Sequence, residues 1–79
     1  PFKEISLEAK TNYENLDRIG YAYLISTDFT KTDSIPLFEI TWKKEANRAE
    51  TVKDMSKLQE WLKLRLNNKN IQITEKPIN

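Results

Sequence analysis

The residues best suited to contact a charged ligand gather between positions 42 and 57. Lysine and arginine side chains contact phosphates and an indole ring stacks on bases, so this combination predicts binding to single-stranded or non-specific nucleic acid. The members of this basic cluster are Trp42, Lys43, Lys44, Arg48, Lys53 and Lys57. Acidic residues interrupt the cluster, and thirteen Lys and Arg against twelve Asp and Glu leave a net charge of only +1. The favoured interpretation is therefore a solvated face, and nucleic-acid binding is kept as the alternative function.

The chain contains neither histidine nor cysteine. This composition excludes disulfides, cysteine or histidine metal sites, and the Ser-His and Cys-His pairs of nucleophilic catalysis. We therefore expect no catalytic residues, no metal site and no cofactor. No apolar run approaches the length of about 20 residues that spans a membrane, and the first residues lack the pattern of a secretory signal. We expect a soluble, cytoplasmic protein with no membrane partner.

One long helix, over residues 47–67, is the element around which we expect the chain to be arranged. Asn47 is one candidate N-cap and places Glu50 in the first turn, while Thr51, followed three residues later by Asp54, is another. Apolar residues recur at intervals of three and four, which predicts one buried stripe. The stripe consists of Val52, Met55, Leu58, Leu62 and Leu66. The asparagines that follow tolerate a left-handed conformation and should end the helix.

Residues 2–10 alternate between two parities, with Ile5, Leu7 and Ala9 on one of them, and this period-two pattern predicts a first strand. The competing interpretation is an N-terminal helix ended by Gly20. Its stripe would consist of Ile5, Ala9, Tyr13 and Leu16.

Three further segments carry strand patterns. Residues 19–26 are apolar on both parities, which is typical of a strand covered on both faces. A polar connection over residues 27–34 leads to Pro36, which bars a helix at the residue before it. Residues 37–43 alternate again, and residues 71–74 form a short last strand.

This order of elements predicts a single α+β domain over residues 1–79. Its arrangement is βββαβ, a four-stranded, mostly antiparallel sheet with one helix packed on one face. The right-handed crossover rule makes the last strand parallel to one of the earlier strands.

A single helix covers only one side of such a sheet, so some aromatic and apolar surface would remain for a protein partner or a second copy of the chain. The candidate partner-binding residues are Tyr21, Tyr23, Phe38, Trp42, Ile71 and Ile73. The last strand is short and edge-like, and it offers unpaired backbone groups for strand addition. The competing interpretation is that the tyrosines lie on a solvated sheet face.

The run Asn47-Arg48-Ala49-Glu50, opening a helix after a strand, resembles the start of the first helix in ribonuclease H-like proteins. Gly20-Tyr21 and Thr74-Glu75 fall where that family carries similar residues, and the strand order is similar to the first half of its fold, over residues 5–75.

The resemblance implies that carboxylates from strand one, the first helix and strand four converge on two magnesium ions. Glu50 and Glu75 match two of these positions. Ala9 occupies the third, and the neighbouring Glu8 would point to the opposite face of a strand. The incomplete set implies a truncated, non-enzymatic version of the fold that binds a partner, as HicB-type antitoxins do.

Taken together, these features predict a small non-enzymatic interaction protein, a subunit, inhibitor or antitoxin-like protein that binds its partner through an open sheet face or edge. Nucleic-acid binding through the basic cluster ranks second. Metal-dependent phosphodiester cleavage by Glu8, Glu50 and Glu75 ranks third.

Overall fold

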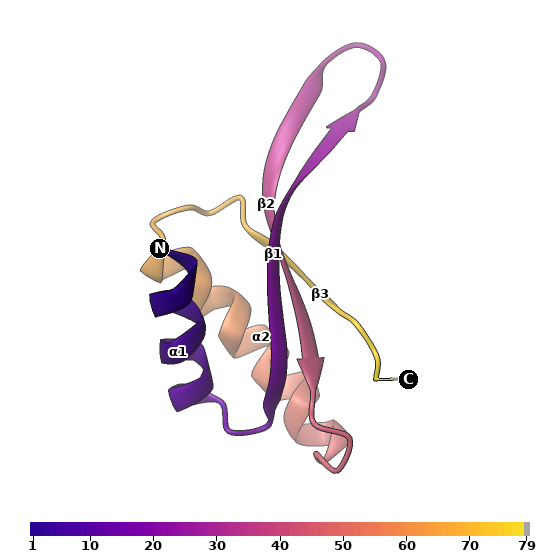
Figure 1. Cartoon of the computed structure of the whole chain (residues 1–79). Coiled ribbons are helices and arrows are strands. Elements are labelled where there is room, and N and C mark those ends of the chain that lie inside the picture. The colour runs from indigo at the N-terminus through magenta and orange to yellow at the C-terminus, as the bar shows by residue number, and fades with distance from the viewer. Residues whose placement is uncertain (79) are drawn as a thin grey trace.

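The computed structural model describes residues 1–78 and shows two helices and three strands (Figure 1). The elements are α1 (Phe2–Asn12), β1 (Leu16–Thr27), β2 (Thr32–Trp42), α2 (Arg48–Arg65) and β3 (Gln72–Glu75). The sheet order is β1-β2-β3, with β2 antiparallel to β1 and parallel to β3. The predicted α+β class and the parallel last strand are confirmed. The predicted four strands with one helix are wrong, because the sheet is three-stranded and mixed and the helices number two.

The difference arises in the first segment, where residues 2–10 form a helix instead of a strand. Ile5 and Ala9 are buried, whereas Leu7 between them is 61% exposed. A strand would place all three side chains on one face, while a spacing of four residues brings only Ile5 and Ala9 onto one helical face. The helical alternative is therefore correct, although α1 ends at Asn12 and not at Gly20.

The start of α2 agrees with the earlier of the two predicted caps. The Asn47 side chain accepts a hydrogen bond from the Glu50 N–H at 3.2 Å, which satisfies one of the unpaired donors of the first turn. The Thr51 hydroxyl instead donates to the Arg48 carbonyl oxygen at 3.0 Å, and Thr51 is buried.

The predicted stripe of α2 is only partly correct. Leu58 and Leu62 are fully buried and Met55 packs against the core, but Val52 is 55% exposed and Leu66 is 36% exposed at the C-terminal end. None of the helices in the described part of the chain is long and apolar enough to cross a membrane.

A single core joins both helices to one face of the sheet. Its buried apolar members are Ile5, Ala9, Leu16, Phe38, Ile40, Trp42, Leu58, Leu62 and Ile71. Alternate residues of β2 supply the centre of this core, which is the period two predicted for residues 37–43. The central position of β2, with strands on both sides, explains why this strand is the best-buried element.

The outer half of the β1–β2 hairpin extends away from the core. Every residue from Tyr21 to Ser34 is exposed, and Figure 1 shows the hairpin projecting well beyond the ends of both helices. We call residues 21–35 the arm. The radius of gyration is 13.4 Å, against about 11.6 Å for a compact chain of this length.

The arm corrects two predictions. Residues 19–26 are not covered on both faces, and residues 27–34 are not a long connection, because β1 continues to Thr27 and β2 resumes at Thr32. β3 pairs only with Leu37 to Ile40, so the arm is a two-stranded ribbon.

Candidate functional site

The turn at the tip of the arm displays Phe29. Its side chain is 96% exposed, and its φ of 69° lies in the left-handed region, which costs a bulky residue about 1–2 kcal/mol. The Phe29 N–H donates to the Thr27 hydroxyl at 3.0 Å, and Asp28 Oδ1 accepts the N–H groups of Thr30 and Lys31, each at 2.8 Å. These two N–H donors hold the pKa of Asp28 below its ordinary value, that of Lys31 having the larger effect. The turn therefore holds the Phe29 ring in solvent, although its backbone conformation is strained.

Apolar side chains continue along β1 on both faces of the arm. Tyr23 and Ile25 share a face with the helices and are 60% and 72% exposed, while Leu24 on the opposite face is 44% exposed. No residue from Ile19 to Thr27 is charged. Because β1 is the outer strand of the sheet, this uncharged stretch also carries a free backbone edge.

An apolar notch lies at the base of the arm, where the ends of the two helices meet β1. The Tyr21 ring stacks on Phe2 with centroids 6.0 Å apart and lies 5.0 Å from the Phe38 ring. The notch has a volume of about 250 Å³. We call it the basal notch; it is lined by Pro1, Phe2, Ile5, Tyr21, Phe38 and Leu66.

Tyr21 and Tyr23 form an edge-to-face pair with ring centroids 5.6 Å apart. The adjacent Tyr23 phenol raises the pKa of the Tyr21 phenol, and partial burial adds to this shift. The two rings thus extend the aromatic surface from the basal notch onto the arm.

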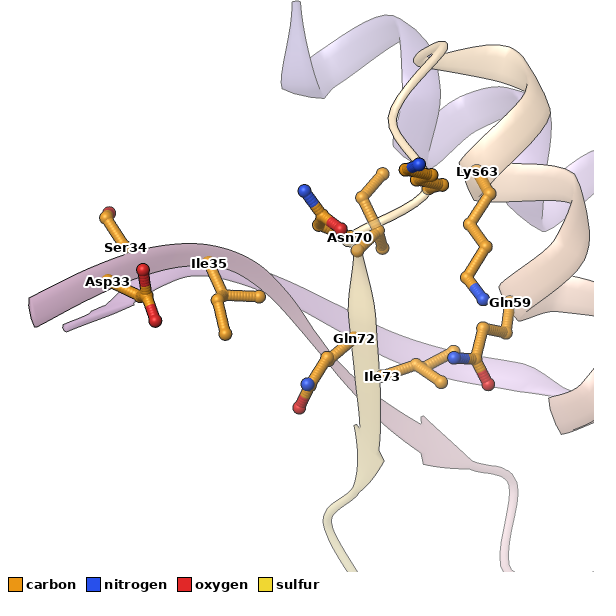
Figure 2. Close-up of a pocket in the computed structure, with 10 residues that line it drawn as sticks. Asp33, Ser34, Ile35, Gln59, Lys63, Asn70, Gln72 and Ile73 are labelled. Atoms are coloured by element: carbon orange, nitrogen blue, oxygen red, sulfur yellow. The ribbon is translucent and has the colours of Figure 1, made fainter. Parts of the chain in front are cut away.

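A second, polar cleft lies on the other side of the arm, along the edge of β2 that β3 leaves unpaired. Figure 2 shows Asp33, Ser34 and Ile35 on this edge, with Gln59 and Lys63 of α2 beyond β3. The cleft has a volume of about 550 Å³ and is lined mainly by amide and charged side chains. It contrasts with the uncharged edge of β1.

The structure separates the candidate partner-binding residues into two groups. Tyr21 and Tyr23 belong to the arm and are exposed. Phe38, Trp42 and Ile71 are 1%, 6% and 2% exposed, and Ile73 is half-buried against the core. These four residues hold the fold together and leave little or no side-chain surface for a partner.

Sequence reasoning missed three exposed residues of the arm, which are Leu24, Ile25 and Phe29. The signal for the first two was present, since residues 19–26 are apolar on both parities. It indicated a strand covered on both faces, whereas the structure leaves residues 21–26 exposed. No sequence signal marks Phe29, because a bulky residue at positive φ is rare.

The basic cluster is only partly available to a ligand. Trp42 is buried with its ring edge-on to Tyr13, at a centroid distance of 6.5 Å, so it has no free face for a base. Arg48 Nη1 donates to both carboxylate oxygens of Glu75 at 3.0 Å. Among the other members, Lys43 is half-buried and three are exposed, namely Lys44, Lys53 and Lys57.

The three carboxylates that the ribonuclease H resemblance singled out lie at two distant places. Arg65, the last residue of α2, binds Glu8 at 3.0 and 2.9 Å, whereas Glu75 is bound at the first residue of α2 and Glu50 lies in its first turn. The 18 residues of α2 span about 27 Å. Among the described residues, no group of three or more acidic, His or Cys side chains is placed to hold a metal ion. Ala9, the third family position, is in the core.

Comparison with known proteins gives one match. A family model described as "Domain of unknown function (DUF8492)" covers residues 1–76 of the chain. No curated protein and no solved structure matches it.

Proposed function

The chain belongs to the DUF8492 family, and we propose that it is a small non-enzymatic interaction protein that binds a protein partner through its arm. The observation that carries this proposal is Phe29, a 96% exposed aromatic ring held at positive φ on the tip of a projecting hairpin. Strained residues persist where the surrounding structure enforces them, and they concentrate at binding and switch sites.

The composition of the arm supports a protein partner. Aromatic residues dominate the binding energy of protein interfaces because they bury a large area with few rotatable bonds. Tyr23, Ile25 and Phe29 are each at least 60% exposed within a stretch of seven residues. A concentration of large exposed apolar side chains is typical of surfaces that bind another protein.

The charge of the arm favours a protein over a nucleic acid. Residues 21–35 contain one cation, Lys31, and two anions, Asp28 and Asp33, which gives a net charge of −1. Binding to a phosphate backbone depends on several cations that displace counterions, and the arm lacks them. The exposed lysines of the basic cluster lie outside the arm, with Lys53 and Lys57 on α2 and Lys44 in the turn before it.

Affinity capture with matched variants tests the proposal. The wild-type chain, Phe29→Gly and Leu64→Ala are each immobilised and incubated with an extract of the source cells that also contains a second copy of the chain with a different tag. Leu64 is the control because it is 82% exposed on α2, outside the arm.

We expect the wild type and Leu64→Ala to retain the same protein and Phe29→Gly to lose at least about nine-tenths of it, as for an interface hot spot. Capture that is equal for all three variants, or no specific capture by the wild type, would contradict the proposal.

A further inference from the structure

Resting on the proposed function, we infer that the protein bound by the arm is a second copy of the same chain, and that the two β1 strands pair edge to edge in antiparallel orientation. The two three-stranded sheets then become one continuous sheet across a two-fold axis.

The free edge of β1 has the backbone orientation that such pairing requires. The Lys76 N–H donates to the Ile40 carbonyl oxygen on the β3 side of β2, at 2.7 Å. Because backbone groups alternate in direction along a strand, the neighbouring Glu39 points its N–H and C=O toward β1, where its partner is Gly20. By the same alternation, Tyr21 and every second residue after it point their backbone groups outward.

This edge carries none of the features with which proteins block strand addition, namely charged residues, proline and bulges. From Ile19 to Thr27 the chain is uncharged and contains no proline. The one irregularity in pairing lies between Leu16 and Arg18, below this stretch. The edge therefore remains open for another strand.

The length of the arm identifies that strand as a second β1. From Tyr21, at the basal notch, β1 runs to Thr27 over about 20 Å of extended chain, and Phe29 follows in the turn at the tip. In an antiparallel pair with Ile25 on the two-fold axis, Tyr23 of one copy lies opposite Thr27 of the other, and the turn after Thr27 brings Phe29 beside Tyr21 of the other copy. Both Phe29 rings then reach the basal notch of the partner at the same time, and a two-fold interface requires such mutual contacts.

The charges at the two ends of the arm are also complementary. The tip carries Asp28 and Lys31 at the two ends of its turn. At the basal notch, the start of α1 and the end of α2 lie together, since Phe2 and Leu66 both line it. Helix N-termini favour anions and helix C-termini favour cations. The start of α1 therefore suits Asp28 of the tip, and the end of α2 suits Lys31.

Cysteine cross-linking tests the register, because the natural chain contains no cysteine to interfere. Ile25→Cys places two cysteines across the axis with their Cα atoms about 5.5 Å apart, a separation that a disulfide accepts. Leu64→Cys is the exposed control on α2. In addition, Tyr23→Cys is mixed with Thr27→Cys, because these positions face each other only between copies. In a dimer of either variant alone, the two cysteines lie about 13 Å apart along the strands.

We expect Ile25→Cys to form a dimer at least about tenfold faster than Leu64→Cys, and the mixture to cross-link while its single components do not. The uncross-linked wild type should sediment with twice the chain mass of 9.3 kDa at high concentration, and Phe29→Gly should weaken this dimer about tenfold or more.

A wild-type mass that stays at 9.3 kDa up to about 0.5 mM, well above the concentrations at which specific dimers form, would overturn the inference. Cross-linking of Ile25→Cys that is no faster than that of Leu64→Cys would also overturn it. The proposed function would survive either result if affinity capture still retained a different protein through Phe29, and both would fail if it retained none.

Discussion

The Tyr21 ring stacks on the Phe2 ring with centroids 6.0 Å apart and planes inclined by 22°, at the point where the arm leaves the core. This contact joins the first residue of α1 to the base of the arm. The Phe38 ring, 5.0 Å from Tyr21, extends this aromatic packing into the core. The base of the arm is therefore packed against aromatic rings, whereas Phe29 at its tip is exposed.

Removing the Phe2 ring should destabilise the fold and remove a contact at the base of the arm. Aromatic pairs contribute about 0.5–1.5 kcal/mol beyond their buried area, and the ring is 41% exposed, so we expect Phe2→Ala to lower the free energy of unfolding by about 1–2 kcal/mol. Urea unfolding measures the change. Leu7→Ala, an exposed position in the same helix, should change it by less than about 0.5 kcal/mol. Equal effects of the two variants would show that the stacked pair adds nothing.

Phe29→Gly should separate folding from binding. Glycine adopts the left-handed conformation without steric cost, which offsets its greater flexibility in the unfolded chain. We expect the free energy of unfolding to stay constant or to rise by up to about 1 kcal/mol. Thr30→Gly is the matched control, because Thr30 has negative φ and should lose about 0.5–1 kcal/mol. A loss above about 1 kcal/mol in thermal unfolding of Phe29→Gly would mean that the ring packs within its own chain.

Truncation of two leucines of α2 that lie half a helical turn apart should change the free energy of unfolding by very different amounts. Leu62 is fully buried, and Leu62→Ala should cost about 2–5 kcal/mol through lost burial and a residual cavity. Leu64 is 82% exposed, and Leu64→Ala should cost less than about 0.5 kcal/mol. Chemical denaturation of both variants checks the orientation of α2, and similar losses would contradict it.

The ion pair between Glu8 and Arg65 should make stability depend on acid pH. The hydrogen bonds from Arg65 lower the pKa of Glu8 below its ordinary value of 4.5. A depressed pKa stabilises the fold above the unfolded value, and this contribution disappears as pH falls from 4.5 through the folded pKa. Glu8→Gln should therefore flatten the stability profile in that window.

Urea midpoints measured from about pH 6 down to about pH 3 provide the check. Glu45→Gln removes an exposed carboxylate and controls for the loss of one charge. The pair has no influence on stability if the Glu8→Gln profile keeps the wild-type slope below pH 4.5.

The parts of the fold that follow local rules could be predicted from the sequence. The Asn47 cap and the spacing of Leu58 and Leu62 locate α2, and the alternation around Phe38 locates the buried part of β2. The first segment could not be resolved, because Ile5, Leu7 and Ala9 satisfy a strand pattern and Ile5 and Ala9 alone satisfy a helical one. Only the position of the core, which leaves Leu7 in solvent, decides between them.

The arm could not be predicted, for a different physical reason. An apolar strand such as residues 19–26 indicates burial, but the sequence does not show whether the same chain or another one supplies the cover. The turn at Phe29 also lacks the glycine or asparagine that normally marks positive φ. The polar residues at the strand ends on either side of this turn instead predicted a connection over residues 27–34.

Photo-cross-linking from the tip of the arm inside cells tests directly whether the arm binds a protein. A photoreactive phenylalanine analogue replaces Phe29 in one variant and Leu64 in another, and both positions are more than four-fifths exposed. We expect one discrete cross-linked protein product from position 29 and none of comparable yield from position 64. No product from position 29, or equal and diffuse products from both positions, would contradict the claim that the arm binds a protein.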